Sequence, residues 1–250
     1  MKKKLIICAD DFGLTQGINR AIVRCYIAGR ISLTTIIPNS MFFDEAINLA
    51  KTHEIPCGVH LTLATEFDLS PLCSLLKDTP KNNDGTLFSN IFPYLNGADE
   101  ELVYNEFRAQ ILKVINAGLN PTHIDSHMHV FSIPLLKRLS EEFHIPCRDF
   151  IEHQPKPDEI HFHLTTCGDT EEKKIHALIK FISEINKRVN IVICHPTDDS
   201  DEMCGYISNH YPGRYYWLTV LRFQDINCLM SDIIGMALEN TDAILTDSFT

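Results

Sequence analysis

Short runs of β-branched and aliphatic residues alternate along this chain with longer segments whose apolar residues recur every three or four positions. The short runs predict strands and the longer segments predict amphipathic helices, because the two structures bury side chains with different periods. Strands are expected at 4–9, 33–37, 58–63, 122–127, 146–150, 160–165, 190–194 and 243–247. Helices are expected at 17–28, 43–52, 99–117, 134–143, 171–187 and 215–229.

This alternation predicts a parallel sheet whose strands are joined by crossover helices. Up to eight strands in 250 residues favour an α/β fold with a closed (β/α) barrel, either TIM-like or irregular, over an open, doubly wound sheet. No G-x-G-x-x-G turn follows the first strand, which argues against the dinucleotide-binding form of the open sheet. Residues 1–250 are therefore interpreted as one domain, with a loop insertion at about 65–97 where Pro, Asn, Asp and Gly break the periodicity.

The composition excludes several classes of protein. A formal net charge of -11 argues against a nucleic acid or an anionic membrane as partner. The apolar run after the three N-terminal lysines ends at Ala9, too short for a signal peptide, and no run approaches the length of a membrane span. Nine scattered cysteines without a C-x-x-C pair indicate reduced thiols, so a cytoplasmic location is expected.

Two adjacent carboxylates, Asp10 and Asp11, end the first predicted strand. Like charges on neighbouring residues repel, and each resists desolvation. A divalent cation that binds one carboxylate removes this conflict and leaves the other as a base. By itself, the pair is equally consistent with two solvated aspartates where a strand stops.

Histidines occur towards the ends of three further predicted strands. His60 lies in an otherwise apolar strand, and His195 lies in a C-H-P motif. In the strand predicted at 122–127 and the residues after it, alternation places four titratable side chains on one face: His123, Asp125, His127 and His129. A single histidine such as His60 is more often a core residue than a ligand. Together, the matching strand-end positions predict a divalent-metal site made of two histidines and one carboxylate.

Five segments together resemble the YdjC-like carbohydrate deacetylases, a family that includes the chitooligosaccharide deacetylases. They are A-D-D-F-G at 9–13, S-L-T-T-I-I-P-N at 32–39, G-V-H-L-T-L at 58–63, P-T-H-I-D-S-H-M-H at 121–129 and C-H-P at 194–196. The segments follow the family's order over nearly the whole chain. The resemblance implies a barrel-like fold related to polysaccharide deacetylases and removal of N-acetyl groups from small acetylated aminosugars.

The same resemblance implies roles for individual residues. One divalent metal ion, Mg²⁺ or Zn²⁺, is expected on Asp11, His60 and His127. Asp10 is the expected general base, and His195 is the expected general acid. The expected partner is a small acetylated sugar, and a homodimer is one expected assembly. Substrate-binding or supporting roles are expected for Asp125, His129, Arg148 and Trp217.

The sequence departs from the family pattern at two places. Phe131 stands where members often continue the histidine strand as H-x-H-x-H. Members also commonly carry R-x-x-E-L near the C-terminal helix, whereas Arg214 is followed here by Trp217 and Leu218. The expected metal ligands are unaffected. These changes bear on substrate choice, since an exposed aromatic ring could stack on a sugar.

Two other functions stay open at this point. A metal-dependent phosphoesterase or amidohydrolase on the same barrel would use similar histidines, but with more ligands or two metals. A catalytically inactive carbohydrate-binding relative would keep the fold, and Phe131 and Trp217 motivate that alternative. A glycoside hydrolase is disfavoured because adjacent carboxylates seldom flank a bond from opposite sides.

Overall fold

The computed structural model of the chain describes residues 3–63, 69, 72, 100–127, 133–148, 158–198, 204–205 and 216–249, with 133, 217 and 218 described by their backbone alone. The predicted insertion at 65–97 lies outside the described residues, apart from Leu69 and Leu72. The strands are β1 (Lys4–Phe12), β2 (Leu33–Ile36), β3 (Cys57–Leu61), β4 (Ile124–Ser126), β5 (Glu159–His163), β6 (Val189–Cys194) and β7 (Ile244–Leu245). The helices are α1 (Gln16–Ile27), α2 (Phe43–His53), α4 (Glu100–Asn116), α5 (Ile133–Phe143), α6 (Glu171–Ser183), the π-helix η5 (Tyr216–Leu221), α8 (Arg222–Met230) and α9 (Asp232–Glu239).

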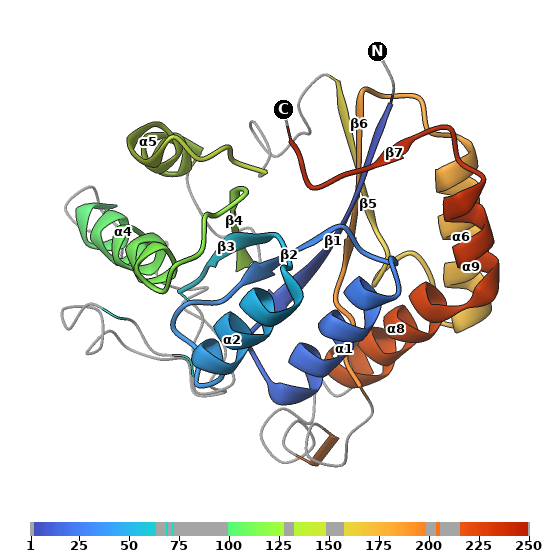
Figure 1. Cartoon of the computed structure of the whole chain (residues 1–250), viewed down its shortest axis with the longest axis horizontal. Helices are drawn as coiled ribbons and strands as arrows, with labels where there is room; N and C mark the ends of the chain where they lie inside the picture. The colour runs from blue at the N-terminus through green and yellow to red at the C-terminus, as the bar shows by residue number, and fades with distance from the viewer. Residues whose placement is uncertain are drawn as a thin grey trace.

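The described strands pair in parallel in the order β4-β3-β2-β1-β6-β5, with β1 near the middle (Figure 1). β7 pairs with Lys4 and Leu5 of β1, whereas β2 pairs with Cys8 to Phe12 of the same strand. The result is a curled half-barrel, and no ladder joins β5 to β4 within the described part of the chain. The predicted α/β class is confirmed, and the barrel is an irregular one.

The helices lie around the edges and outer face of this sheet. Figure 1 shows α4 and α5 beside β3 and β4, while α6, α8 and α9 pack against one another on the other side. Side-chain hydroxyls cap the N-termini of three of the described helices: Thr15 accepts a hydrogen bond from the Ile18 amide, Thr170 from the Lys173 amide and Ser231 from the Ile234 amide. The predicted helix at 171–187 overruns the observed α6, and the one at 215–229 is divided between η5 and α8.

The predicted strand at 146–150 is not a full strand within the described residues. Cys147 forms only an isolated parallel bridge with Ile124. Pro146 accepts a hydrogen bond from the Ile124 amide but has no N–H to donate, which limits the ladder at this position. Residues 149–150 lie outside the described part.

Alternate residues of the strands face two different cores. Leu5, Ile7 and Ala9 of β1 belong to the large cluster beneath the helices. The residues between them join a smaller cluster inside the half-barrel, formed by Ile6, Cys8, Leu33, Val189, Ile191, Ile193 and Phe249. Because side chains alternate along a strand, Asp10 and His195 continue this inner face beyond Cys8 and Ile193. The strand-end polar residues therefore lie over a small apolar core.

Candidate active site

A β-bulge in β1 allows two adjacent aspartates to serve one site. Ala9 pairs with Thr34 and Phe12 pairs with Ile36, so Asp10 and Asp11 together oppose a single residue of β2. Asp11 adopts φ 73°, a left-handed conformation that costs a non-glycine residue about 1–3 kcal/mol. Both side chains are buried. Without the bulge, strand alternation would direct the two carboxylates to opposite faces.

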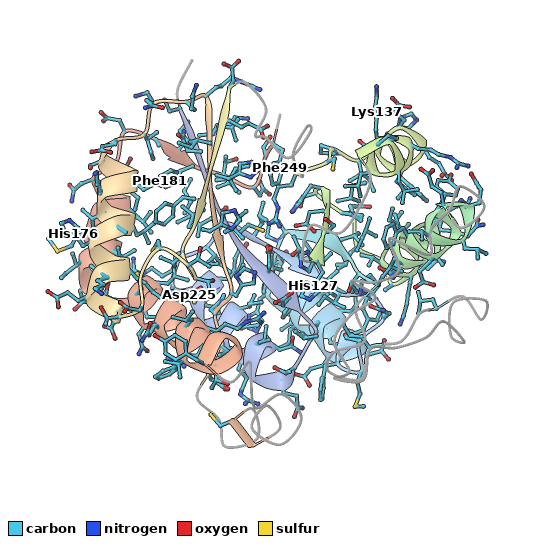
Figure 2. All side chains as sticks on the ribbon, turned by 180° about the vertical axis from the view of Figure 1, so that it is seen from behind. His127, Lys137, His176, Phe181, Asp225 and Phe249 are labelled. Carbon is cyan, nitrogen blue, oxygen red and sulfur yellow. The ribbon has the colours of Figure 1, made fainter. Side chains whose placement is uncertain are left out.

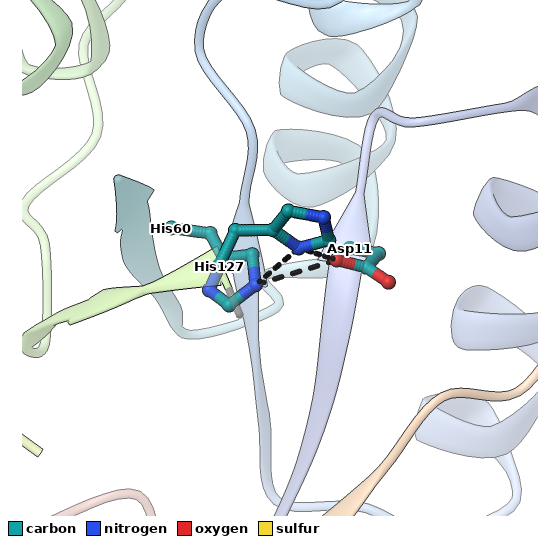
Figure 3. Close-up of side chains that lie close together, drawn as sticks. All are labelled: Asp11, His60 and His127. Carbon is teal, nitrogen blue, oxygen red and sulfur yellow. Dashed lines mark hydrogen bonds and ion pairs between the residues drawn. The ribbon is translucent and has the colours of Figure 1, made fainter. Parts of the chain in front are cut away.

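Asp11, His60 and His127 converge from three separate elements (Figure 3). Oδ1 of Asp11 lies 3.3 Å from Nε2 of His60 and 3.0 Å from Nδ1 of His127. The two imidazole nitrogens are 3.2 Å apart. All three side chains are buried. The structure therefore brings together the three residues expected to hold a metal.

These separations fit a shared cation. Ligand atoms that each lie about 2.0–2.2 Å from one ion are separated by about 2.8–3.6 Å when the angle between them is roughly 90–110°. The observed range of 3.0 to 3.3 Å falls inside that interval. Two histidines and one carboxylate with further positions for water or substrate form a common divalent site.

The hydrogen bonding of His60 also favours a cation at this place. Its Nδ1 lies 2.8 Å from Oδ1 of Asp125, so Nδ1–H donates there and Nε2 is the nitrogen that faces Asp11. Both oxygens of Asp11 are buried without a hydrogen bond of good geometry from the described residues. Burial lowers the pKa of His60, but Asp125 and Asp11 outweigh it and hold that pKa well above its usual value. A positive charge between Nε2 and the carboxylate satisfies both groups.

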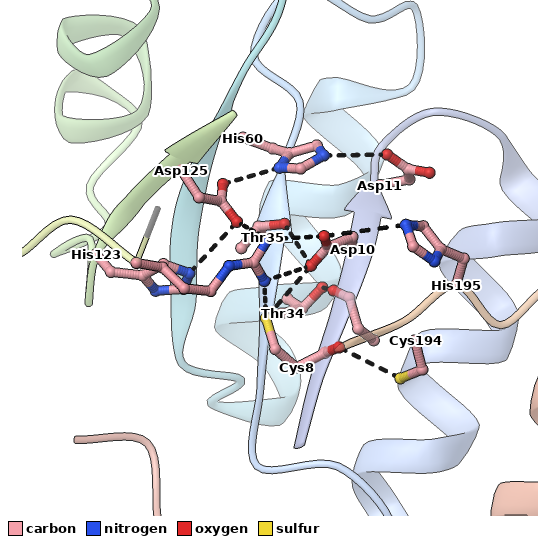
Figure 4. A network of polar contacts seen from close by, with 12 residues as sticks. Cys8, Asp10, Asp11, Thr34, Thr35, His60, His123, Asp125, Cys194 and His195 are labelled. Carbon is pink, nitrogen blue, oxygen red and sulfur yellow. Dashed lines mark hydrogen bonds and ion pairs between the residues drawn. The ribbon is translucent and has the colours of Figure 1, made fainter. Parts of the chain in front are cut away.

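A network of buried polar contacts holds Asp10 and Asp125 in place beside the three converging residues (Figure 4). Arg148 donates to both oxygens of Asp10, at 2.7 and 2.8 Å, and also pairs with Oδ2 of Asp125. Thr35 donates to Asp10 at 3.3 Å. Burial raises the pKa of Asp10, but the charge and hydrogen bonds of Arg148, together with the nearby His60, outweigh it and lower that pKa to about 2. Asp10 is therefore an anion at neutral pH.

His123, expected on the same face as Asp125, is buried below this network. Its Nε2 lies 3.7 Å from Oδ2 of Asp125, and its ring packs on Phe249 with centroids 4.4 Å apart. A Cβ atom on Gly58 would lie 2.4 Å from Cε1 of His123. Only glycine at position 58 therefore leaves room for this imidazole.

His195 faces the site from the end of β6. Its Nε2 is 4.0 Å from Oδ2 of Asp10, and its Nδ1 is 2.8 Å from the hydroxyl of Thr165. Burial, followed by the nearby charge of Arg222, lowers the pKa of His195 to about 3. The imidazole is therefore neutral at rest, whereas the general-acid role expected of it requires a proton.

Four buried residues of the site did not emerge from the sequence. Nη2 of Arg222 forms an ion pair with Oδ2 of Asp11 at 2.7 Å. Burial raises the pKa of Asp11, but Arg222 and His127 outweigh it, so that pKa lies well below its usual value. The other three, which stand behind His195, are Thr165, Lys174 and Asp225. Thr165 ends a predicted strand, and Arg222 and Asp225 interrupt an apolar helix, which are the signals that could have indicated them.

The other expected contributors fall in segments outside the described residues. His129, like Phe131 and Arg214, lies outside the described residues, and so does the side chain of Trp217 in η5.

Among the described helices, none is both long enough and apolar enough to cross a membrane.

Comparison of the sequence with known proteins identifies a family and curated relatives. The sequence model of the YdjC-like protein family matches residues 4–240. The chain is 36% identical over 173 residues to a carbohydrate deacetylase of Brevibacillus brevis, covering 66% of this chain and 67% of that protein. It is 30% identical over 207 residues to a carbohydrate deacetylase of Geobacillus stearothermophilus, covering 78% of this chain and 80% of that protein.

Solved structures agree in fold. A putative cellobiose-phosphate cleavage protein from Enterococcus faecalis superposes with a TM-score of 0.75 at 25% identity, covering 98% of this chain and 97% of that one. A peptidoglycan N-acetylglucosamine deacetylase superposes with a TM-score of 0.56 at 9% identity, covering 98% of this chain and 86% of that one. The second likeness concerns the fold alone.

Proposed function

This chain belongs to the YdjC-like protein family, and on that premise we propose that it is a carbohydrate deacetylase that hydrolyses N-acetyl groups of small aminosugars with the help of one divalent ion. The observation that carries the proposal is the convergence of Asp11, His60 and His127 within 3.0 to 3.3 Å, beside the Asp10–Arg148 pair. Chitooligosaccharides are the proposed substrate class.

Asp11, His60 and His127 would hold the ion, as Mg²⁺ or Zn²⁺. Such an ion, when bound, lowers the pKa of water and polarises an amide carbonyl. Asp125 holds the imidazole of His60 in the tautomer that a ligand needs, with Nε2 unprotonated. Arg222 pairs with the second oxygen of Asp11, which leaves Oδ1 to face the two histidines.

Asp10 would accept the proton of the attacking water. Its pair with Arg148 keeps it ionised and oriented. The leaving sugar nitrogen then needs a proton, which neutral His195 cannot supply from its resting state. Nε2 of His195 lies 4.0 Å from Oδ2 of Asp10, roughly one ångström beyond a hydrogen bond. The proton taken from water therefore passes from Asp10 to His195 and on to the amine, so that one proton serves both steps.

A two-metal phosphoesterase or amidohydrolase fits these contacts less well. Asp10, His60 and Asp125 form a second group of possible ligands. The guanidinium of Arg148 already bridges Asp10 and Asp125, and its positive charge disfavours a second cation between them. This arrangement supports one ion for each chain.

Release of acetate from diacetylchitobiose tests the proposal. The chain is treated with a chelator, then resupplied with Mg²⁺, Zn²⁺ or Mn²⁺, and acetate is measured. We expect turnover only with an ion, none in His60→Ala, and normal turnover in His176→Ala, which changes an exposed histidine of α6 (Figure 2). Ion-dependent hydrolysis of a phosphate ester without acetate release from any acetylated sugar would contradict it.

A further inference from the structure

A row of buried polar contacts connects helix α6 with His195. Nζ of Lys174 lies 2.7 Å from Oδ1 of Asp225, 2.9 Å from the carbonyl oxygen of Leu164 and 2.7 Å from that of Thr165. Lys174 and Asp225 are fully buried, and Asp225 comes from α8 (Figure 2). Each of the three ammonium protons therefore has an acceptor.

The second carboxylate oxygen of Asp225 accepts hydrogen bonds from residues just beyond the ends of β5 and β6. Oδ2 accepts hydrogen bonds from the backbone amide of His195 at 3.0 Å and from the hydroxyl of Thr165 at 2.5 Å. An ammonium group on one oxygen and a peptide N–H on the other mark Asp225 as the accepting, ionised partner. Thr165 has a single hydroxyl proton, and it points at Asp225.

The register of the strands explains why Thr165 and His195 meet. His163 of β5 pairs with Ile193 of β6, and the Leu164 amide donates to the Ile193 carbonyl. Two residues further on, Thr165 and His195 lie side by side at the ends of the two strands. Nδ1 of His195 is 2.8 Å from the hydroxyl oxygen of Thr165. Because the hydroxyl proton is directed to Asp225, this contact requires the proton to be on Nδ1.

We propose that Thr165, held by the Lys174–Asp225 pair, is a positioning residue that fixes His195 in the Nδ1–H tautomer and so presents Nε2 to Asp10. This assignment rests on the proposed function only for its catalytic meaning. In that tautomer Nε2 carries the lone pair, which the transfer from Asp10 to the sugar amine requires. Once Nε2 is protonated, the connected hydrogen bonds from Nδ1–H through Thr165 to Asp225 stabilise the imidazolium.

Nitrogen-resolved NMR of the histidine side chains tests the tautomer directly. Long-range ¹H–¹⁵N spectra of the ¹⁵N-histidine protein are recorded at neutral pH, and His195 is identified by the signal missing from His195→Gln. We expect the Nδ1–H pattern in the wild type and in Thr165→Ser. Thr165→Val, which keeps the shape but removes the hydroxyl, is expected to shift His195 to Nε2–H or to a mixture of tautomers.

Turnover gives a second, separate readout. Thr165→Val is expected to lower kcat about tenfold or more, which is part of the 10²–10⁴-fold rate increase that acid–base assistance contributes. Thr165→Ser, which keeps the hydroxyl, is expected to retain most of the wild-type kcat. An Nε2–H pattern in the wild type overturns the assignment, and that spectrum suffices if Thr165→Val fails to fold. An unchanged pattern in folded Thr165→Val also overturns it. If the spectra behave as expected but the wild type releases no acetate, the deacetylase proposal fails and the tautomer assignment stands.

Discussion

Asp125 accepts a hydrogen bond from Nδ1 of His60 at 2.8 Å, and the two residues are register partners on the adjacent parallel strands β3 and β4. A carboxylate behind a ligating histidine fixes both the orientation and the tautomer of the ring. The strand register, rather than a loop, therefore positions one side of the candidate metal centre.

Replacing Asp125 should weaken metal binding without removing a ligand. In Asp125→Asn the negative charge behind His60 is lost, so we expect metal affinity to fall by about 10–100-fold. Calorimetric titration of chelator-treated protein with Zn²⁺ measures the change. Asp242→Asn, an exposed substitution of the same kind, should bind as the wild type does. Unchanged affinity in Asp125→Asn would show that Asp125 does not support His60.

Asp10 should affect turnover and leave the metal in place. Asp10→Asn removes the proposed base, and a loss of roughly 10²–10⁴ in kcat is expected. Metal content of the purified variant should equal that of the wild type, because Asp10 is not among the three converging ligands. Near-native turnover of diacetylchitobiose by Asp10→Asn would assign the base elsewhere.

His195 should make folding stability depend on pH under acidic conditions. Because its folded-state pKa is about 3 and an ordinary histidine has a pKa of about 6.5, the unfolded chain binds a proton between these values that the folded chain does not. The contribution of His195 to the free energy of unfolding therefore rises with pH in that window, by up to about 1.4 kcal/mol per pH unit. In urea unfolding with chelator present, His195→Gln should have a shallower dependence than the wild type between pH 4.5 and 6.5. His176→Ala should keep the wild-type slope, and equal slopes in all three proteins would refute the shift.

The Lys174–Asp225 pair should matter for stability well beyond a surface ion pair. Lys174→Met leaves a buried, uncompensated carboxylate, and breaking a buried pair in this way costs about 3–5 kcal/mol. Denaturant unfolding measures the loss, and adding Asp225→Asn should recover part of it. Exposed Lys173, which pairs with Asp169 at the surface, is the matched control, and Lys173→Met should leave the free energy of unfolding close to that of the wild type. A similar, small effect for both lysines would contradict the buried pairing.

The sequence predicted the parts of the fold that depend on local pattern. The apolar run at 4–9 predicted the first strand, and β1 spans it from Lys4 to Phe12. Within the described part of the chain, seven of the residues that the resemblance singled out lie together: Asp10, Asp11, His60, Asp125, His127, Arg148 and His195.

The remaining site residues depend on contacts that local pattern does not contain. The bulge that turns Asp11 inward is a property of pairing with β2, so residue order alone does not reveal it. Arg222 and Asp225 reach the site only because α8 packs next to α1 and α6. Of the strand predicted at 146–150, the described residues show only the bridge between Cys147 and Ile124, and apolar character does not report the missing donor of Pro146.

Metal content after exhaustive dialysis against Zn²⁺ tests the central claim most directly. Elemental analysis should find one ion per chain in the wild type and in His176→Ala, and none above background in His60→Ala and His127→Ala. Two ions per chain, or full occupancy in both ligand variants, would contradict a single cation held by Asp11, His60 and His127.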